Sequence, residues 1–231
     1  MKRVAVILPA AGKSVRMGLK TPKPFLPLEG VPMLARSIEA FQECRGVDLI
    51  QPVLPKAHLS RFRERLLKKY SWQKCSPAVP GGRERQDSVL RGLEALPDEV
   101  EIVVVHDAAR PLVSASLINR VLDAAESTGA ALAALPVHDT VKRASAGMYV
   151  GKTVERRGLW LAQTPQAFRR SLLREAYDRA AASGLRGTDE AYLVEAIDHP
   201  VCLVPGSALN LKVTTREDLS LARLILRSRG V

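Results

Sequence analysis

The sequence predicts an α/β fold in which a mostly parallel β-sheet is covered by helices. Short apolar runs alternate with segments of helical periodicity over the first 136 residues, which is typical of parallel strands joined by helices. The run 103–105 is Val-Val-Val, and successive apolar positions indicate a strand that is buried on both faces. Aromatic residues make up only 4% of the chain, so the core must be built from Leu, Val, Ile and Ala.

The first half of the chain supplies the predicted sheet and its first helices. The expected strands are 4–10, 47–54, 102–106 and 130–136. Apolar residues recur at helical spacing in the segments 33–44, 88–96 and 117–125. A basic segment over 61–69 predicts a surface helix, with Leu66 and Leu67 as its buried side.

The pattern changes near residue 137. The segments 138–145 and 149–155 are β-prone, carry charges at alternate positions and flank Ala-Gly-Met at 146–148. They predict an extended β-hairpin with little core of its own, an excursion over about 137–158 from a single domain spanning 1–231. An exposed hairpin needs cover, and a partner subunit is one way to supply it.

The last third of the chain returns to alternating helices and strands. Helices are expected over 169–182 and 188–196, followed by a short strand at 201–204. A final helix is expected from Arg216 to about Arg227, with Thr215 as its N-cap because a Thr hydroxyl can accept from a free backbone N–H.

Composition excludes several classes of protein. The 231 residues are 46% hydrophobic and 26% charged, which is ordinary for a globular chain. No apolar run approaches the roughly 18 residues of a membrane span, and no cleavable secretory signal is evident. Three widely spaced cysteines favour neither a disulfide framework nor a zinc site. We therefore expect a reduced, cytoplasmic protein without a membrane partner.

The net charge is +11. A basic chain can bind nucleic acid, an anionic membrane or a small polyanion such as a nucleotide, and it can also simply carry a solvated basic surface. The clusters at 61–69 and 223–229 lie on predicted helices and favour the solvated surface. Aromatic residues interleaved with the basic ones, which would stack on bases, are absent, so nucleic acid is not the expected partner.

The first motif with chemistry is Leu-Pro-Ala-Ala-Gly-Lys-Ser-Val-Arg-Met-Gly at 8–18, where the first strand ends. Ligands bind at the carboxyl edge of a parallel sheet, and small residues let backbone N–H groups approach phosphate oxygens. The motif is not a Walker A loop, because Ile7 stands where that loop needs glycine. The alternative is a small-residue turn with a surface Arg16.

The second motif is Gly-Gly-Arg-Glu-Arg-Gln-Asp-Ser at 81–88, between a predicted strand and a predicted helix. Two glycines permit close backbone approach, and a helix start offers free N–H groups to an anion. The alternative is an ordinary turn in which Asp87 or Ser88 caps the helix.

The third motif is His-Asp-Ala-Ala-Arg-Pro at 106–111, after the most apolar strand. An Asp at the carboxyl end of a central strand is placed to hold a cation or a substrate hydroxyl. The alternative is a structural salt bridge between Asp107 and Arg110. Further polar segments are Asp139-Thr140, Arg156, Gln-Thr-Pro-Gln at 163–166, Thr-Asp-Glu at 188–190 and Asn-Leu-Lys-Val-Thr-Thr at 210–215, in which Lys212 follows an uncharged stretch.

Together, and in this order, these motifs resemble those of the 2-C-methyl-D-erythritol 4-phosphate cytidylyltransferases of the non-mevalonate isoprenoid pathway. The resemblance covers nearly the whole chain. It implies a Rossmann-like nucleotidyltransferase fold with a β-arm that joins a homodimer. It also implies a Mg²⁺-dependent reaction in which CMP passes from CTP to the sugar-alcohol phosphate and pyrophosphate is released.

The resemblance also implies roles for individual residues. Arg16 and Lys23 match the family's pair that stabilises the transition state around the triphosphate, and Arg156 and Lys212 match the pair that positions the sugar phosphate. The nucleotide-binding positions are Ala10, Ala11 and Gly12, which match the backbone cradle for CTP, and Gly81, Gly82 and Ser88, which match the cytosine turn. Asp107, Ala108 and Arg110 match contacts near the sugar alcohol and the metal, with Asp107 as the metal ligand and most of the coordination from phosphates and water. Thr140, Thr164 and Thr188 match contacts on the substrate side.

Three residues depart from the family's usual pattern. Ser14 stands where glycine is common, Val15 lacks a charge often found beside Arg16, and Arg83 replaces an acidic residue in the cytosine turn. Two other functions stay open from the residues alone. One is cytidylyl transfer to ribitol 5-phosphate by the same fold, and the other is a regulatory or nucleic-acid-binding role suggested by the pI of about 10.0.

Overall fold

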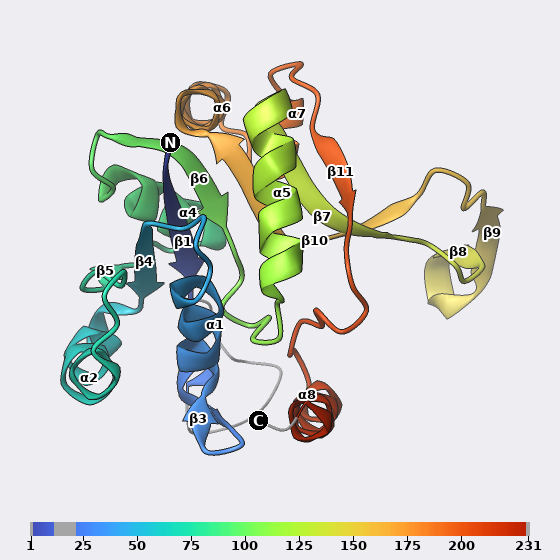
Figure 1. Cartoon of the computed structure of the whole chain (residues 1–231). Helices are drawn as coiled ribbons and strands as arrows, with labels where there is room; N and C mark the ends of the chain where they lie inside the picture. The colour runs from blue at the N-terminus through green and yellow to red at the C-terminus, as the bar shows by residue number, and fades with distance from the viewer. Residues whose placement is uncertain (1, 12–21, 230–231) are drawn as a thin grey trace.

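The computed structural model describes residues 2–11 and 22–229 of the chain. Within them, a sheet of seven strands has the order β11-β7-β10-β6-β1-β4-β5 (Figure 1). The strands are β1 (Arg3–Pro9), β4 (Leu49–Leu54), β5 (Val79–Pro80), β6 (Val100–Val105), β7 (Ala130–Pro136), β10 (Trp160–Arg169) and β11 (Cys202–Pro205). Neighbours run parallel except at β10, which is antiparallel to both β6 and β7. The predicted mostly parallel sheet is confirmed.

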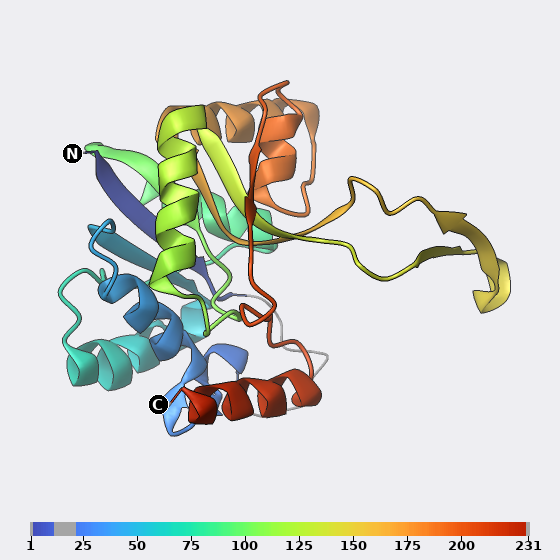
Figure 2. The ribbon, with the colours of Figure 1, turned by 45° about the vertical axis from the view of Figure 1, so that its right-hand side comes forward.

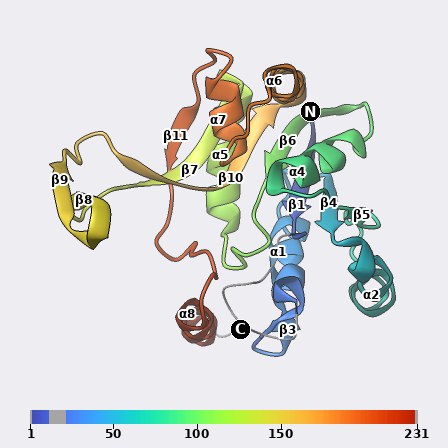
Figure 3. The same cartoon turned by 180° about the vertical axis from the view of Figure 1, so that it is seen from behind.

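Helices cover both faces of this sheet. On one face lie α1 (Met33–Gln42) and α5 (Ala115–Thr128), and on the other lie α4 (Arg85–Glu94), α6 (Arg170–Ser183) and α7 (Glu190–Glu195) (Figures 1 and 3). The alternation along β1 explains the two layers: Val4, Val6 and Leu8 pack on the α1 side, whereas Ala5 and Ile7 pack on the α4 side. Because both faces are buried, the strands are almost continuously apolar.

The final helix, α8 (Arg216–Ser228), packs away from the sheet. Its apolar side joins a separate cluster with Leu28 and Met33, which belong to the segment between β1 and β4. That segment holds η2 (Lys23–Phe25), β2 (Pro27–Leu28) and β3 (Val31–Pro32). Thr215 is the N-cap of α8, as expected, and accepts from the Asp218 N–H in a capping box.

The basic segment predicted as a surface helix is helical but irregular. It comprises η3 (Lys56–His58), α2 (Leu59–Phe62), η4 (Arg63–Leu67) and α3 (Lys68–Tyr70). Leu66 is buried, as expected, and Leu67 is half-buried.

The predicted hairpin is present and stands away from the sheet (Figure 2). Strands β8 (Val141–Ala144) and β9 (Val150–Val154) pair antiparallel, with the short η5 (Ala146–Met148) between them. We call residues 137–159 the arm. Met148 is 92% exposed and Tyr149 is 75% exposed, so the tip of the arm carries large apolar side chains without cover from this chain.

One strand of the seven-stranded sheet was missing from the sequence-based expectation. Strand β10 follows the arm directly and enters the sheet between β6 and β7. It brings the segment 163–166 beside the carboxyl end of β6, where the third motif begins. None of the helices described is both long and apolar enough to cross a membrane.

Candidate active site

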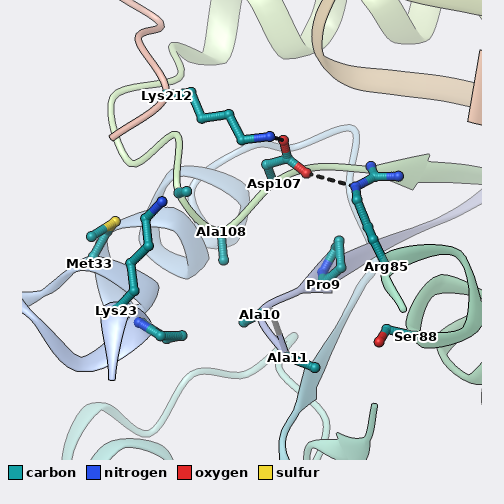
Figure 4. A pocket seen from close by; sticks show the side chains of 12 residues that line it. Pro9, Ala10, Ala11, Lys23, Met33, Arg85, Ser88, Asp107, Ala108 and Lys212 are labelled. Atoms are coloured by element: carbon teal, nitrogen blue, oxygen red, sulfur yellow. Dashed lines mark hydrogen bonds and ion pairs between the residues drawn. The ribbon is translucent and has the colours of Figure 1, made fainter. Parts of the chain in front are cut away.

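A cavity of about 260 Å³ lies at the carboxyl ends of β1 and β6, the edge where a parallel sheet binds its ligands (Figure 4). Its lining comes from the first, second and third motifs, from η2 and the start of α1, and from the segment before α8. The lining residues are Pro9, Ala10, Ala11, Lys23, Pro24, Met33, Arg85, Ser88, Asp107, Ala108, Ala109 and Lys212. Segments far apart in the sequence therefore meet at one site.

The first two motifs are in contact with each other. A Cβ added to Gly81 would lie 2.3 Å from the Ala11 Cβ, so only glycine allows this approach. Ser88 holds the glycine turn in place: its hydroxyl accepts from the Gly82 N–H at 3.1 Å and donates to the Glu84 carbonyl at 2.9 Å. The N-cap of α4 is Glu84, which forms a capping box with Asp87, so Ser88 shapes the turn instead of capping the helix.

Asp107 lies between two cations (Figure 4). Its Oδ1 is 3.1 Å from Arg85 Nε, and its Oδ2 is 2.6 Å from Lys212 Nζ. Burial alone would raise the pKa of Asp107, but Arg85 and Lys212 outweigh it and hold that pKa well below its usual range. The salt bridge considered between Asp107 and Arg110 is absent, because the Arg110 guanidinium donates to the Asn210 carbonyl at 2.7 Å.

Arg85 is fixed from behind by a buried carboxylate. Its Nη1 and Nη2 lie 2.9 Å from Oε1 and Oε2 of Glu190, and the Tyr177 hydroxyl donates to Oε1 at 3.1 Å. Burial would lower the pKa of Arg85, but Glu190 and Asp107 raise it above its usual range. Burial raises the pKa of Glu190, and Arg85 opposes that shift. The result is a chain of charges from Glu190 through Arg85 and Asp107 to Lys212.

Behind Asp107 lies the buried imidazole of His106. Its Nδ1 is 3.1 Å from the Thr164 hydroxyl oxygen, and its Nε2 is 3.1 Å from the Arg110 carbonyl oxygen. The same Thr164 oxygen accepts from the Asp107 N–H at 3.0 Å. Burial lowers the pKa of His106 to about 4, so the ring is neutral near pH 7.

Several residues singled out from the sequence do not line the cavity. Thr140 and Thr188 are exposed, whereas Arg110 and Thr164 are buried and bonded within the protein. Arg156 is exposed, donates to the His138 carbonyl and belongs to a separate hollow at the base of the arm. Arg83 is exposed and is not a lining residue. Gly12, Ser14, Val15 and Arg16 lie outside the described residues.

Two residues of the charge chain were not singled out from the sequence. Arg85 is the first residue of α4, where the helix dipole disfavours a cation, so its position was a signal that nearby carboxylates compensate the charge. Glu190 is 1% exposed and lies in the Thr-Asp-Glu segment, but no local pattern distinguishes a buried Glu from a solvated one.

Comparisons with known proteins place the chain among the nucleotidyltransferases. More particularly, it belongs to the 2-C-methyl-D-erythritol 4-phosphate cytidylyltransferase family, whose model matches residues 4–228. A relative of that name from Syntrophus aciditrophicus is 42% identical over 225 residues, which cover 97% of this chain and 96% of the relative.

Solved structures agree with this assignment. The 4-diphosphocytidyl-2C-methyl-D-erythritol synthase of Anaerococcus prevotii superposes with a TM-score of 0.85 at 30% identity and covers 98% of this chain and 99% of its own. The 2-C-methyl-D-erythritol 4-phosphate cytidylyltransferase of Thermus thermophilus gives a TM-score of 0.79 at 39% identity, covering 97% of this chain and 99% of its own. The resemblance of the motifs to this family is thereby confirmed.

Proposed function

We propose that this chain transfers CMP from CTP to 2-C-methyl-D-erythritol 4-phosphate, giving 4-diphosphocytidyl-2-C-methyl-D-erythritol and pyrophosphate. Membership of the family supports the activity. The observation that carries the proposal for this site is that Lys23, Arg85 and Lys212 line one cavity with the small residues of the first motif. Such a cavity admits a chain of phosphates and surrounds it with fixed positive charge.

The reaction forms one bond and breaks one bond. A phosphate oxygen of the sugar-alcohol phosphate attacks the α-phosphorus of CTP, and the bond between the α-phosphorus and the bridging oxygen breaks to release pyrophosphate. The attacking monoester needs no general base, because its second pKa is about 6 and it is already an anion at neutral pH. Catalysis is then a matter of positioning two anions and stabilising the charge that develops.

The roles proposed for individual residues are those that the resemblance implies. Lys23 and Arg16 stabilise the charge that builds on the triphosphate, and Lys212 and Arg156 hold the sugar phosphate. Ala10, Ala11 and Gly12 cradle the triphosphate through their backbone, and the turn of Gly81, Gly82 and Ser88 reads the cytosine. The placement of Lys23 and Lys212 on one cavity supports the first two roles.

The residues fit a divalent metal that arrives with the nucleotide. In the described part of the chain no three His, Cys, Asp or Glu side chains gather into a metal site, and Asp107 is the one carboxylate on the cavity wall. Mg²⁺ in such enzymes commonly takes one or two carboxylates and completes its shell with phosphates and water. Asp107 would hold it through an oxygen that Lys212 now contacts. Bound there, the metal would neutralise charge on the triphosphate.

We also propose that the arm joins a homodimer and that Arg156 completes the site of the neighbouring subunit. Two features of this chain support the proposal. Met148 and Tyr149 at the tip are exposed apolar side chains that need a partner surface. Arg156 lies apart from the cavity that holds Lys23 and Lys212, so its assigned role requires a second copy. The chain is proposed to work as a single domain, in the cytoplasm.

Release of pyrophosphate tests the activity. Purified protein with CTP and Mg²⁺ is assayed with 2-C-methyl-D-erythritol 4-phosphate, with ribitol 5-phosphate and with neither. Release with the first substrate alone is the expected result. Comparable release with ribitol 5-phosphate would contradict the substrate assignment, and no release with either, together with salt-sensitive binding to nucleic acid, would contradict the enzyme assignment.

A further inference from the structure

Four buried residues behind the cavity form a closed circuit of hydrogen bonds, which we call the His106 circuit. It links His106 to Thr164, Thr164 to Asn210, Asn210 to Arg110, and Arg110 back to His106. The Asn210 amide donates to the Thr164 carbonyl at 2.8 Å, and the Arg110 guanidinium donates to the Asn210 carbonyl at 2.7 Å. All four residues are at most 9% exposed.

The circuit joins the two segments that carry Asp107 and Lys212 of the cavity wall to strand β10. His106 and Arg110 enclose the turn that carries Asp107, Thr164 belongs to β10, and Asn210 precedes Lys212 by two residues. The turn is closed further by the Arg110 N–H, which donates to the Asp107 carbonyl at 2.9 Å. Asp107 and Lys212 therefore both take their positions from the circuit.

The direction of each bond around the imidazole follows from its partners. The Arg110 carbonyl can only accept, so the hydrogen of the neutral ring is on Nε2. Nδ1 is then an acceptor, and the Thr164 hydroxyl donates to it. The Thr164 oxygen in turn accepts the Asp107 N–H. The other neutral tautomer would break the bond to the Arg110 carbonyl, and a charged ring would reverse donor and acceptor at Thr164.

When the Thr164 hydroxyl donates to His106 Nδ1, its only hydrogen is already engaged. Thr164 is 4% exposed and is not a lining residue of the cavity. A buried hydroxyl that already donates to His106 cannot also donate to a substrate. The placement therefore favours a role through Asp107 over the direct substrate contact that the resemblance implies.

We propose that His106, held by hydrogen bonds at both ring nitrogens, is a positioning residue for the transfer reaction, acting through Thr164 on Asp107 and through Arg110 and Asn210 on Lys212. The proposal rests on the proposed cytidylyl transfer, since its effect is measured on that reaction. A misplacement of about 1 Å at reacting groups can cost about 100-fold in rate, so a device that fixes two of them has a measurable effect.

Two matched variants of Thr164 separate hydroxyl chemistry from packing. Thr164→Ser keeps the hydroxyl and should retain kcat within about threefold, whereas Thr164→Val keeps the shape and should lower kcat by about 10-fold or more. His106→Phe, which removes both ring nitrogens, should lower kcat similarly. Because the residues act as one unit, the double variant Thr164→Val with His106→Phe should be no slower than the slower single variant.

Three results would overturn the proposal. The first is a double variant whose losses multiply. The second is Thr164→Val with a raised KM for the sugar phosphate and unchanged kcat while His106→Phe remains normal, which would make Thr164 a direct substrate contact. The third is a pair of variants with lowered melting temperature but normal kcat, which would leave the circuit a purely structural role.

A measurement on the unaltered protein keeps the test independent of folding and of activity. The chain has four histidines, so ¹⁵N-imidazole spectra at pH 7 can be assigned by changing His58, His138 and His199 to Gln one at a time. His106 should give the pattern of a ring with hydrogen on Nε2, which donates to the Arg110 carbonyl. A ring with hydrogen on Nδ1 alone could not make that bond and would overturn the proposal even if the transfer activity is established.

Discussion

Lys212 and Asp107 form an ion pair in which Nζ lies 2.6 Å from Oδ2. The contact joins the turn after β6 to the segment before α8, and the remaining oxygen of Asp107 is taken by Arg85. An anion that binds Lys212 must compete with Asp107, and a cation that binds Asp107 must compete with Lys212. Each predicted substrate contact therefore replaces one that the protein already makes.

Replacing Lys212 should affect the sugar phosphate first. Lys212→Ala removes a charge-assisted hydrogen bond to that phosphate, a contact worth enough to lower kcat/KM for the sugar-alcohol phosphate by about 100-fold. Steady-state kinetics with each substrate varied in turn measures the split. Lys56→Ala, on the exposed η3, is the matched control and should be normal. A raised KM for CTP alone would contradict the assignment.

Replacing Lys23 should affect turnover instead. Its charge is assigned to the triphosphate as the bond to pyrophosphate breaks, and loss of such a contact costs about 10²–10³ in rate. Lys23→Ala should therefore lower kcat by that factor with little change in KM for the sugar-alcohol phosphate. A variant with near-normal turnover and only a greater need for that substrate would show that the role of Lys23 is wrongly assigned.

The glycine turn should make the enzyme selective for CTP over UTP, ATP and GTP. A tight turn tests the hydrogen-bonding edge of a small base, and a mismatched edge leaves buried groups unpaired. Gly81→Ala should raise KM for CTP by about 10-fold or more, because its Cβ would meet Ala11 at 2.3 Å.

Gly46→Ala is the control for this variant, since its Cβ meets only the movable side chains of Leu122 and Asn119. Turnover of UTP comparable to that of CTP would refute the selectivity. It would indicate that Arg83, which replaces an acidic residue in the turn, has changed base recognition.

The proposed dimer predicts complementation between two inactive variants. If each site takes Lys23 from one subunit and Arg156 from the other, a mixed dimer of Lys23→Ala and Arg156→Ala has one doubly defective site and one intact site. Random exchange makes about half of the dimers mixed, so activity should recover to roughly a quarter of the unmodified enzyme. Recovery should require subunit exchange and should not follow brief mixing. Activity equal to the parental average, although mixed dimers are shown to form, would place Arg156 in its own subunit's site.

His106 should make stability depend on pH in the acidic range. Its pKa in the folded state is about 4, below the ordinary value of 6.5. Between pH 6.5 and pH 4, the unfolded state therefore binds a proton at this imidazole that the folded state does not bind. Stability is therefore lost as the pH falls from 6.5 toward 4. From pH 7 to pH 4 the loss from this group is roughly 3 kcal/mol.

Urea unfolding of the unmodified protein and of His106→Gln at several pH values isolates this contribution as the change in their difference. A difference in the free energy of unfolding that stays constant between pH 7 and pH 4 would contradict the prediction.

Periodicity predicted the parallel strands and their helices because burial on two faces leaves a strong apolar signal. It did not predict β10, whose residues 160–169 include two Gln and a Pro. Pro165 is tolerated because it lies where the register of β10 against β7 shifts between Ala162 and Gln166. β10 is stabilised by pairing with β6 on one side and β7 on the other. These partners are distant in sequence, so a local sequence pattern does not reveal them.

Sequence patterns predicted the site residues that directly follow strands. They did not predict residues whose ion-pair partner lies far away along the chain. The rule that ligands bind at strand ends predicts that the first and third motifs meet at one site. Arg85 depends on Glu190, which lies more than a hundred residues away along the chain and reaches it at 2.9 Å. Thr140, Thr188 and Arg156 are exposed in the single chain. Their predicted contacts need a bound substrate or a second subunit.

The path of the chain through the sheet also bears on how the molecule could be divided. The chain leaves the sheet after β7, passes through the arm and returns as β10, which lies between β7 and β6. A cut at the arm's tip, beside Gly147, would give two fragments in which the neighbours of β10 both belong to the other piece. Exposed tips of this kind are also the sites where nicking is best tolerated. Because the two fragments would be interleaved in the sheet, we expect them to stay together without a covalent link and to assemble when made separately.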